Sequence, residues 1–193
     1  MPSLPLYLAS GSPRRQQLLT LLDRPFRVLL PAVDETPHDA ERPLMLVERL
    51  ARNKAEAGAV LMPEPGLVLG ADTLGELDGQ VLVKPESEQD AARMMRAMSG
   101  RSHFIHTAIA VTDGRRTLSE VVTSTVTFKP LTDAEISAYW HSGEPVDKAG
   151  GYGIQGRGGR FVSHLDGSYF AVVGLPLMET EQLLNRFTGK ETS

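Results

Sequence analysis

Hydrophobic and polar positions follow two periods along this chain, and the places where the period changes mark the predicted elements. Apolar runs typical of strands occupy residues 4–9, 26–30 and 67–71. The last run is so uniformly apolar that we expect a strand buried on both faces, ending at Asp72 and Thr73. Short strands of this kind, separated by helical segments, are typical of an α/β sheet.

Segments with apolar residues at helical spacing lie between the predicted strands. Ser12 is a typical N-cap and Pro13 a typical first residue for a helix that follows the first strand. Pro43 begins a longer helix, along which Leu46 and Leu50 recur on one face. Further helices are expected to begin after Ser87, Thr132 and Pro176.

Two Asp-Gly pairs between alternating segments predict β-hairpins. The first turn is expected at Asp78–Gly79 and the second, in a longer hairpin, at Asp113–Gly114. A glycine-rich loop at residues 144–159 then leads into a strand at 161–165. In total, about five helices and six or seven strands predict an α/β (α+β mixed) fold, in which helices flank a long mixed sheet.

Composition and charge narrow the classes of function. The 193 residues, 41% of them hydrophobic, are enough for one domain or two small lobes with a core. A formal net charge of −4 argues against a protein that coats nucleic acid or an anionic membrane. The absence of cysteine excludes disulfides, thiolate zinc sites and cysteine nucleophiles. With no long apolar run and no signal-peptide pattern, we expect a cytoplasmic protein.

The loop SGSPRR, residues 10–15, is a candidate phosphate site. It joins a strand to a helix N-terminus, where free N–H groups and the helix dipole favour anions, and it carries two adjacent arginines. The alternative is an ordinary Ser-Pro helix cap with solvated arginines. The GxxxxGK[ST] pattern of the common nucleotide-triphosphate loop is absent.

The segment GADT, residues 70–73, is a candidate site for a cation or a reacting water. Asp72 follows a buried apolar strand, which would deliver its carboxylate to the edge of the sheet, although it is equally a common turn residue. The pair Asp34–Glu35 offers a further metal-binding oxygen or is a solvated loop. Lys54 and Lys84, each weak alone, offer positive charge.

The glycine-rich loop has the most unusual composition in the chain. Its glycines permit close backbone approach to a planar ligand, and Tyr152 and Gln155 offer an aromatic wall and an amide that reads a base edge. Its Gly-Arg-Gly-Gly-Arg run is also like a fragment of an RNA-binding segment, which would make the protein a single-stranded nucleic-acid module. The histidines show no metal-ligand spacing, and we interpret them as structural: His103, His106, His141 and His164.

Six motifs occur in a fixed order along the chain: LYLASGSPRRQQLL, GADT, KP at 84–85, MSG at 98–100, EPVDKAGGYGIQG and GSYFAVVGLPL. Their order and spacing, over roughly residues 6–184, resemble the Maf family of nucleoside triphosphate pyrophosphatases. The resemblance implies an elongated mixed sheet flanked by helices with a central cleft, related to the inosine-triphosphate pyrophosphatase fold. It also implies one domain, residues 1–193, with two lobes around a nucleotide cleft.

Members of this family cleave between the α and β phosphates, and the DKAGGYGIQG segment is similar to the branch that acts on dTTP and UTP. The resemblance therefore implies hydrolysis of these pyrimidine triphosphates to a monophosphate and pyrophosphate, in a homodimer that binds no nucleic acid polymer. It implies that a proton acceptor, Asp72, is joined by the phosphate-binding residues Ser10, Arg14, Lys54 and Lys84. It assigns substrate selection to Arg15, Thr73 and Gln155, and a divalent cation, Mg²⁺ or Mn²⁺, to Glu35 and Asp72.

Two positions depart from the family pattern, and a second class of function stays open. Gly75 stands where the family usually has a branched apolar residue, and Gly151 replaces a common alanine, so both are expected to loosen the cleft. The family is also associated with restraint of septum formation. The alternative is therefore a nucleotide-binding regulator of cell division in which catalysis is secondary.

Overall fold

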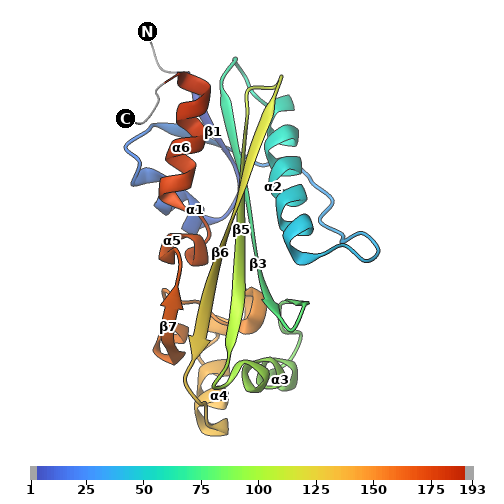
Figure 1. Ribbon diagram of the computed structural model, residues 1–193, viewed down its shortest axis with the longest axis vertical. Coiled ribbons are helices and arrows are strands. Elements are labelled where there is room, and N and C mark those ends of the chain that lie inside the picture. The colour runs from blue at the N-terminus through green and yellow to red at the C-terminus, as the bar shows by residue number, and fades with distance from the viewer. Residues whose placement is uncertain (1–3, 190–193) are drawn as a thin grey trace. The chain divides into compact units, whose positions relative to one another are not determined.

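The strands of this protein form one mixed β-sheet. The computed structural model describes residues 4–189, in which seven strands are ordered β2-β1-β3-β5-β6-β7, with β4 paired to β3 (Figure 1). The strands are β1 (Leu6–Ala9), β2 (Phe26–Leu29), β3 (Leu67–Leu77), β4 (Gln80–Leu82), β5 (Ser102–Thr112), β6 (Thr117–Phe128) and β7 (Val162–Asp166). β1 is parallel to β2 and β3, whereas β4 and β7 pair antiparallel with their neighbours.

Helices flank this sheet and confirm the predicted mixed α/β class. They are α1 (Pro13–Thr20), α2 (Pro43–Val60), α3 (Glu88–Met98), α4 (Asp133–Trp140), α5 (Tyr169–Val173), α6 (Leu177–Thr188) and 3₁₀ helices at Glu144–Asp147, Ala149–Gly151 and Arg157–Phe161. The predicted caps are confirmed, since Ser12 accepts from the Arg15 N–H and Thr132 forms a full capping box with Glu135. Among residues 4–189, no helix is both long and apolar enough to cross a bilayer.

The strand that was expected to end at Asp72 and Thr73 runs on to Leu77, so this boundary was wrong. The chain turns only at Asp78–Gly79, where both φ angles are positive, at 52° and 79°, as in the tight turn predicted there. Asp72 and Thr73 stay inside the strand because their side chains find polar partners on other segments. Polar residues that suggest a turn in the sequence therefore lie in mid-strand, where each has a polar partner.

The described residues divide into two compact units, and the first consists of residues 4–73, 107–122 and 174–189. Its central strands are fully buried, with Leu8 and Leu69 at 0% exposure. Helix α2 lies directly on β3, because a Cβ on Gly70 would come within 2.4 Å of the Ala51 carbonyl oxygen. This close approach of backbones fixes the height of α2, and of Lys54 on it, above the strand.

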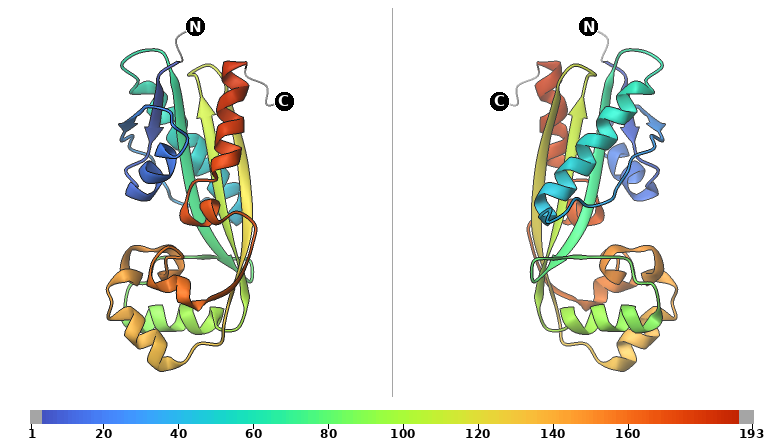
Figure 2. Two further views of the ribbon diagram at one scale, coloured as in Figure 1. Left: turned by 90° about the vertical axis from the view of Figure 1, so that its left-hand side faces the viewer. Right: turned by 90° about the vertical axis from the view of Figure 1, so that its right-hand side faces the viewer.

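The second unit consists of residues 74–106 and 123–173. In it, α3, α4 and the 3₁₀ helices gather on one face of the sheet (Figure 2). The core between them includes Met95, Met98, Phe128, Tyr139 and Phe161, all nearly inaccessible to solvent. The aromatic rings in this core pack edge to face, with the Tyr139 and Phe161 centroids 5.1 Å apart.

The two glycines that depart from the family pattern lie in this second unit. A Cβ at Gly75 would come within 3.0 Å of Leu82 Cδ1, so the neighbouring leucine already fills the space. Gly151 has a φ of 70°, a conformation that alanine adopts only with strain. Each glycine thus has a local structural reason, and their expected effect on the cleft stays a prediction.

His103 and His106 point to opposite faces of β5, as their spacing predicts. His103 Nε2 lies 2.6 Å from the Tyr152 hydroxyl, and burial lowers the pKa of His103 to about 4, so the ring is neutral at pH 7. The two ring nitrogens of His106 each lie 2.8 Å from a partner, Thr123 Oγ1 and Glu76 Oε2. Both rings thus have structural partners within the second unit.

The close contact of α2 with β3 predicts that one methyl group added at Gly70 destabilises the protein. We expect Gly70→Ala to lower the free energy of unfolding by about 1–3 kcal/mol, because the new Cβ meets backbone atoms that cannot rotate away. Urea denaturation followed by circular dichroism measures this change. Gly11→Ala is the control, since its Cβ would meet only the flexible end of Leu30, and an equal loss in both variants would contradict the prediction.

Candidate functional site

The SGSPRR loop connects β1 to α1 and presents the N-terminus of the helix. Ser12 caps the helix through its hydroxyl, and Pro13 follows as the first helical residue, which has no N–H to leave unpaired. The Ser10 hydroxyl accepts from the Ser12 N–H at 3.2 Å. Serine hydroxyls, backbone N–H groups and the positive end of α1 thus gather in one loop, an arrangement that favours an anion.

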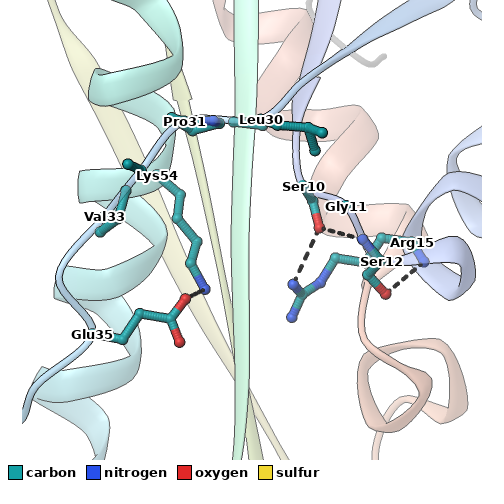
Figure 3. Close-up of a pocket in the computed structure, with 11 residues that line it drawn as sticks. Ser10, Gly11, Ser12, Arg15, Leu30, Pro31, Val33, Glu35 and Lys54 are labelled. Atoms are coloured by element: carbon teal, nitrogen blue, oxygen red, sulfur yellow. Dashed lines mark hydrogen bonds and ion pairs between the residues drawn. The ribbon is translucent and has the colours of Figure 1, made fainter.

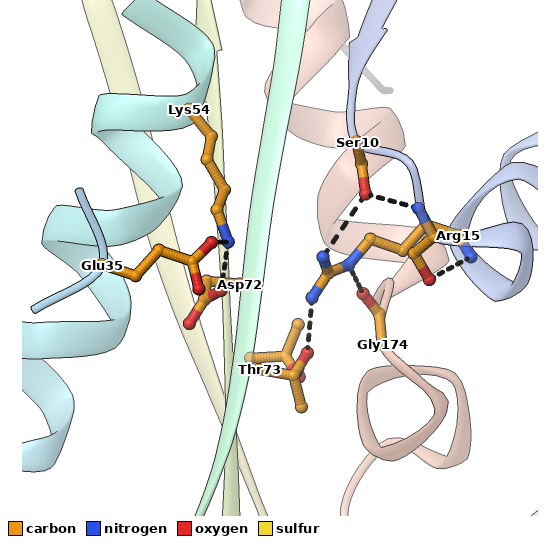
Figure 4. Close-up of polar contacts among 9 residues, drawn as sticks. Ser10, Arg15, Glu35, Lys54, Asp72, Thr73 and Gly174 are labelled. Atoms are coloured by element: carbon orange, nitrogen blue, oxygen red, sulfur yellow. Dashed lines mark hydrogen bonds and ion pairs between the residues drawn. The ribbon is translucent and has the colours of Figure 1, made fainter. Parts of the chain in front are cut away.

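Arg15 crosses from α1 to two other segments (Figure 4). Its Nε donates to the Gly174 carbonyl oxygen at 3.0 Å, and its Nη2 donates to Thr73 Oγ1 at 3.2 Å. Thr73 in turn lies 2.9 Å from the hydroxyl of Thr107. Burial lowers the pKa of Arg15, against the opposing attraction of Asp72. The guanidinium is therefore held rigidly, and it keeps further N–H donors for a ligand.

Lys54 holds two carboxylates together, and we call Glu35, Lys54 and Asp72 the Lys54 cluster. Its Nζ lies 2.7 Å from Asp72 Oδ1 and 2.7 Å from Glu35 Oε1 (Figure 4). The side chains of Lys54 and Asp72 are only 14% and 13% exposed, whereas that of Glu35 is more open. Because one positive charge faces two negative charges, the cluster carries a net negative charge that suits a cation.

The donor set of the cluster fits a divalent cation of the Mg²⁺ type. Such ions are commonly held by one or two carboxylates, with substrate phosphates and water completing the shell. Glu35 and Asp72 supply two carboxylates whose oxygens converge on a single ammonium group. Over residues 4–189, no three His, Cys, Asp or Glu side chains come together, so a metal cage made by the protein alone is absent from this part of the chain.

A pocket with a volume of about 460 Å³ is lined by the SGSPRR loop and by Glu35 and Lys54 (Figure 3). This volume is within the usual range for small-ligand sites. Its lining consists of residues 9–12, Arg15, residues 30–33, Glu35 and Lys54. Arg14 is half-buried in the first turn of α1, directly beside Arg15. The first unit thus brings seven of the predicted site residues into one region.

Glu41 and Arg49 hold the segment that carries Glu35. Arg49 donates from Nε and Nη2 to the two carboxylate oxygens of Glu41, both at 2.7 Å, and also to the Thr36 carbonyl oxygen. This double contact ties residues 36–41 to α2, the helix of Lys54. Sequence reasoning missed it, as it missed Thr107 and Gly174, because the spacing between these partners follows no local period.

Lys84 and Gln155 belong to the second unit. Lys84 is exposed directly after β4, and Gln155 is exposed in the glycine-rich loop. The Gly-Arg-Gly-Gly-Arg run is folded, since residues 157–161 form a 3₁₀ helix and the Gly158 N–H donates to Glu144. An RNA-binding segment of the flexible, repeated kind is therefore not what this run forms.

The fold and the pocket define a class: an α/β protein in which a loop suited to an anion and carboxylates suited to a cation lie in the same unit. The family described as Maf-like protein matches residues 5–187 of the chain. The chain therefore belongs to the Maf family, and the resemblance seen in its motifs is confirmed.

Three curated relatives have the same name, dTTP/UTP pyrophosphatase. The one from Photorhabdus laumondii is 54% identical over 182 residues, which cover 94% of this chain and 93% of the relative. The one from Vibrio cholerae is also 54% identical, with 94% and 97% covered, and that from Aliivibrio fischeri is 51% identical over 186 residues, with 94% and 97% covered. Among solved structures, the Staphylococcus aureus Ham1 protein is 16% identical, with a TM-score of 0.45, covering 64% of this chain and 71% of that one.

Because of the Glu41–Arg49 pair, we expect the free energy of unfolding to depend on pH. The Arg49 guanidinium, together with the His38 N–H, lowers the pKa of Glu41 from an ordinary 4.5 to about 2. Because the pKa is lower in the folded state, the stabilisation is present above pH 4.5 and is lost as the pH falls towards 2. We expect Glu41→Gln to reduce the free energy of unfolding at pH 7 and to reduce it progressively less between pH 4.5 and 2.

Urea denaturation of both proteins across this pH range is the measurement. Glu64→Gln is the matched control, because Glu64 pairs with Arg27 at the surface, where such pairs contribute little. A stability difference for Glu41→Gln that is independent of pH would contradict the prediction.

Proposed function

We propose that this protein is a nucleoside triphosphate pyrophosphatase that hydrolyses dTTP and UTP to the nucleoside monophosphate and pyrophosphate. The observation that carries the proposal is the pocket in which Lys54 and Glu35 face the SGSPRR loop. The shared name of the relatives supports the choice of substrates. A triphosphate is small and strongly anionic, so a few clustered cations suffice for it even in a chain with a net charge of −4.

In the proposed reaction, water attacks the α-phosphorus of the substrate. A bond forms between the water oxygen and this phosphorus, the bond to the oxygen bridging the α and β phosphates breaks, and pyrophosphate leaves. Asp72 orients the water and accepts its proton. Ser10, Arg14 and Lys54 bind phosphate oxygens and stabilise the charge that develops on the leaving group.

Glu35 and Asp72 would hold a divalent cation, Mg²⁺ or Mn²⁺, in this site. When bound, the ion neutralises charge on the phosphates and polarises their oxygens. Before substrate enters, Lys54 holds the two carboxylates together and limits their mutual repulsion.

Selection of the substrate is proposed for Arg15, Thr73 and Gln155, and phosphate binding also for Lys84. Thr73 and Ser10 hold the Arg15 guanidinium, so its remaining donors have a fixed direction. The Gln155 amide is exposed and can pair with the carbonyl oxygens that uracil and thymine share. Such pairing would accept both bases.

The proposal also covers the assembly and the location of the protein. We propose a homodimer, which light scattering on the purified protein tests. We also propose a single domain of two lobes around the nucleotide, and a cytoplasmic protein that does not bind nucleic acid polymers. The absence of cysteine suits a reducing compartment, and the acidic net charge disfavours polyanionic polymers.

The proposed function predicts a narrow range of substrates and a requirement for metal. We expect the purified protein to release pyrophosphate from dTTP and UTP with Mg²⁺ or Mn²⁺, and to prefer them to purine triphosphates. Removal of the ion with a chelator should abolish the release, because the phosphate charge is then not neutralised. A panel of canonical and modified triphosphates, scored for pyrophosphate, measures this. Release of orthophosphate, or equal rates on all triphosphates, would contradict the proposal.

The role of Asp72 predicts a loss in turnover when one of its carboxylate oxygens is replaced by an amide NH2 group. We expect Asp72→Asn to lower kcat for dTTP about 10²- to 10⁴-fold, because the amide cannot accept the proton. Asp113→Asn, at the exposed turn between β5 and β6, is the matched control and should retain activity. Turnover near that of the unaltered protein in Asp72→Asn would remove Asp72 from the proposed mechanism.

A further inference from the structure

The glycine-rich loop of the second unit is wrapped around the carboxylate of Glu144. This side chain accepts three hydrogen bonds from residues near it in space. The Tyr139 hydroxyl donates to Oε1 at 2.7 Å and the Gly158 N–H donates to the same oxygen at 3.1 Å. The Arg157 N–H donates to Oε2 at 2.8 Å. One carboxylate therefore fixes the end of the loop that follows Gln155.

Tyr139 fixes the beginning of the stretch 153–158 within the same loop. Its hydroxyl accepts from the Gly153 N–H at 3.2 Å while it donates to Glu144. The ring is only 1% exposed and packs edge to face on Phe161, so the hydroxyl has little freedom to move. Residues 153–158 are thus held at both ends by one connected pair of side chains, and the exposed Gln155 lies between these ends.

The glycines of the loop are explained by these two side chains. A Cβ at Gly156 would come within 2.6 Å of the carboxylate carbon and of both carboxylate oxygens of Glu144. A Cβ at Gly158 would come within 2.6 Å of the Tyr139 hydroxyl. A side chain at Gly156 would therefore displace the Glu144 carboxylate, and one at Gly158 would also meet the Gly153 backbone oxygen at 2.9 Å.

The charge of Glu144 strengthens this arrangement. Burial raises the pKa of Glu144, but the hydrogen bonds from Tyr139, Arg157 and Gly158 outweigh burial and hold the pKa below its ordinary value. The carboxylate is therefore ionised at neutral pH, and hydrogen bonds to an ionised acceptor are stronger than those between neutral groups. The Lys148 ammonium donates to the Glu144 carbonyl oxygen at 2.8 Å and adds a further tie.

We propose that Glu144, supported by Tyr139, is the positioning residue that sets the place of Gln155 and thereby the selection of the pyrimidine base. This inference rests on the proposed function, in which Gln155 pairs with the base. An amide discriminates between bases only when its donor and acceptor are held in register with the base edge. Glu144 supplies that register through the backbone of the loop.

The test compares base selection with phosphate binding in Glu144→Gln. We expect the ratio of kcat/KM for UTP to that for ATP to fall about tenfold or more, since small misplacements of a contact group have effects of this size. The inhibition constant of inorganic pyrophosphate should stay within about twofold, because the phosphates are bound by other residues. Tyr139→Phe, which removes both hydrogen bonds of the hydroxyl, should lower the ratio in the same direction.

Glu135→Gln is the matched control. Glu135 is also a carboxylate near α4 with several hydrogen bonds, but its partners are Lys129 and Thr132 and not the loop. We expect this variant to lose stability without a change in the UTP-to-ATP ratio. An equal change of the ratio in Glu135→Gln would show a general effect of destabilisation and would overturn the proposal.

A second comparison tests whether Glu144 acts through Gln155. Gln155→Ala should itself lower the UTP-to-ATP ratio, and adding Glu144→Gln to it should then change the ratio no further. Hydrogen exchange should report faster exchange at the Gly153, Arg157 and Gly158 amides in Glu144→Gln, whatever the enzyme activity. Additive effects on the ratio, or unchanged exchange at these amides, would overturn the proposal.

Failure of the inference and failure of the proposed function give different results. If the unaltered protein releases no pyrophosphate from dTTP or UTP, the proposed function is wrong, and the role in base selection is overturned with it. If the unaltered protein selects pyrimidines and Glu144→Gln selects them equally well, the proposed function stands and only the inference is overturned.

Discussion

The candidate site depends on the two ion pairs that the Lys54 ammonium group makes. Two carboxylates, Glu35 and Asp72, lie within 2.7 Å of it and would repel each other without it. Its position above β3 follows from packing, since α2 rests on the strand at Gly70, where a Cβ would collide with the helix backbone. The close contact of the α2 and β3 backbones thus sets the position of the Lys54 ammonium group. That positive charge in turn allows Glu35 and Asp72 to lie close together.

Other polar contacts extend this arrangement to the rest of the first unit. The bidentate pair of Glu41 and Arg49 ties the segment of Glu35 to the helix of Lys54, so two of the three charged groups are held by one helix. On the SGSPRR loop, Arg15 reaches Thr73 and the Gly174 carbonyl oxygen. Lys54 and Arg15 thus each have polar partners on segments distant in the chain, as buried polar groups generally require. Rigid placement of charge before a substrate arrives is what phosphate chemistry demands of a protein.

In the second unit, too, a charged side chain is held by partners from other segments, but there it orders a loop. There the charge of Glu144 is satisfied by backbone N–H groups of the glycine-rich loop and by the Tyr139 hydroxyl. Residues 155–159 carry no apolar side chain to bury, so hydrogen bonds to a fixed carboxylate supply the order that a core would otherwise give. Its glycines follow from the closeness of this contact, and they need not signal flexibility.

The sequence by itself determined the local features of this protein. The strands, the helix starts at Ser12, Thr132 and Pro43, and the tight turn at Asp78–Gly79 all follow from periodicity and capping, which act between residues close in the chain. The motifs, read together, also identified the family. Periodicity failed at Asp72, where polar residues within a strand had the pattern of a turn.

Only the tertiary structure decided which of these residues come into contact. Glu35, Lys54 and Asp72 come from three segments, and Arg15 meets Gly174 across 159 positions of the chain. No local period encodes such a meeting, because it results from the packing of α2 and α1 against shared strands. The physical reason is that hydrogen bonds and ion pairs act over a few ångströms, so their partners are known only once the fold has brought distant segments into contact.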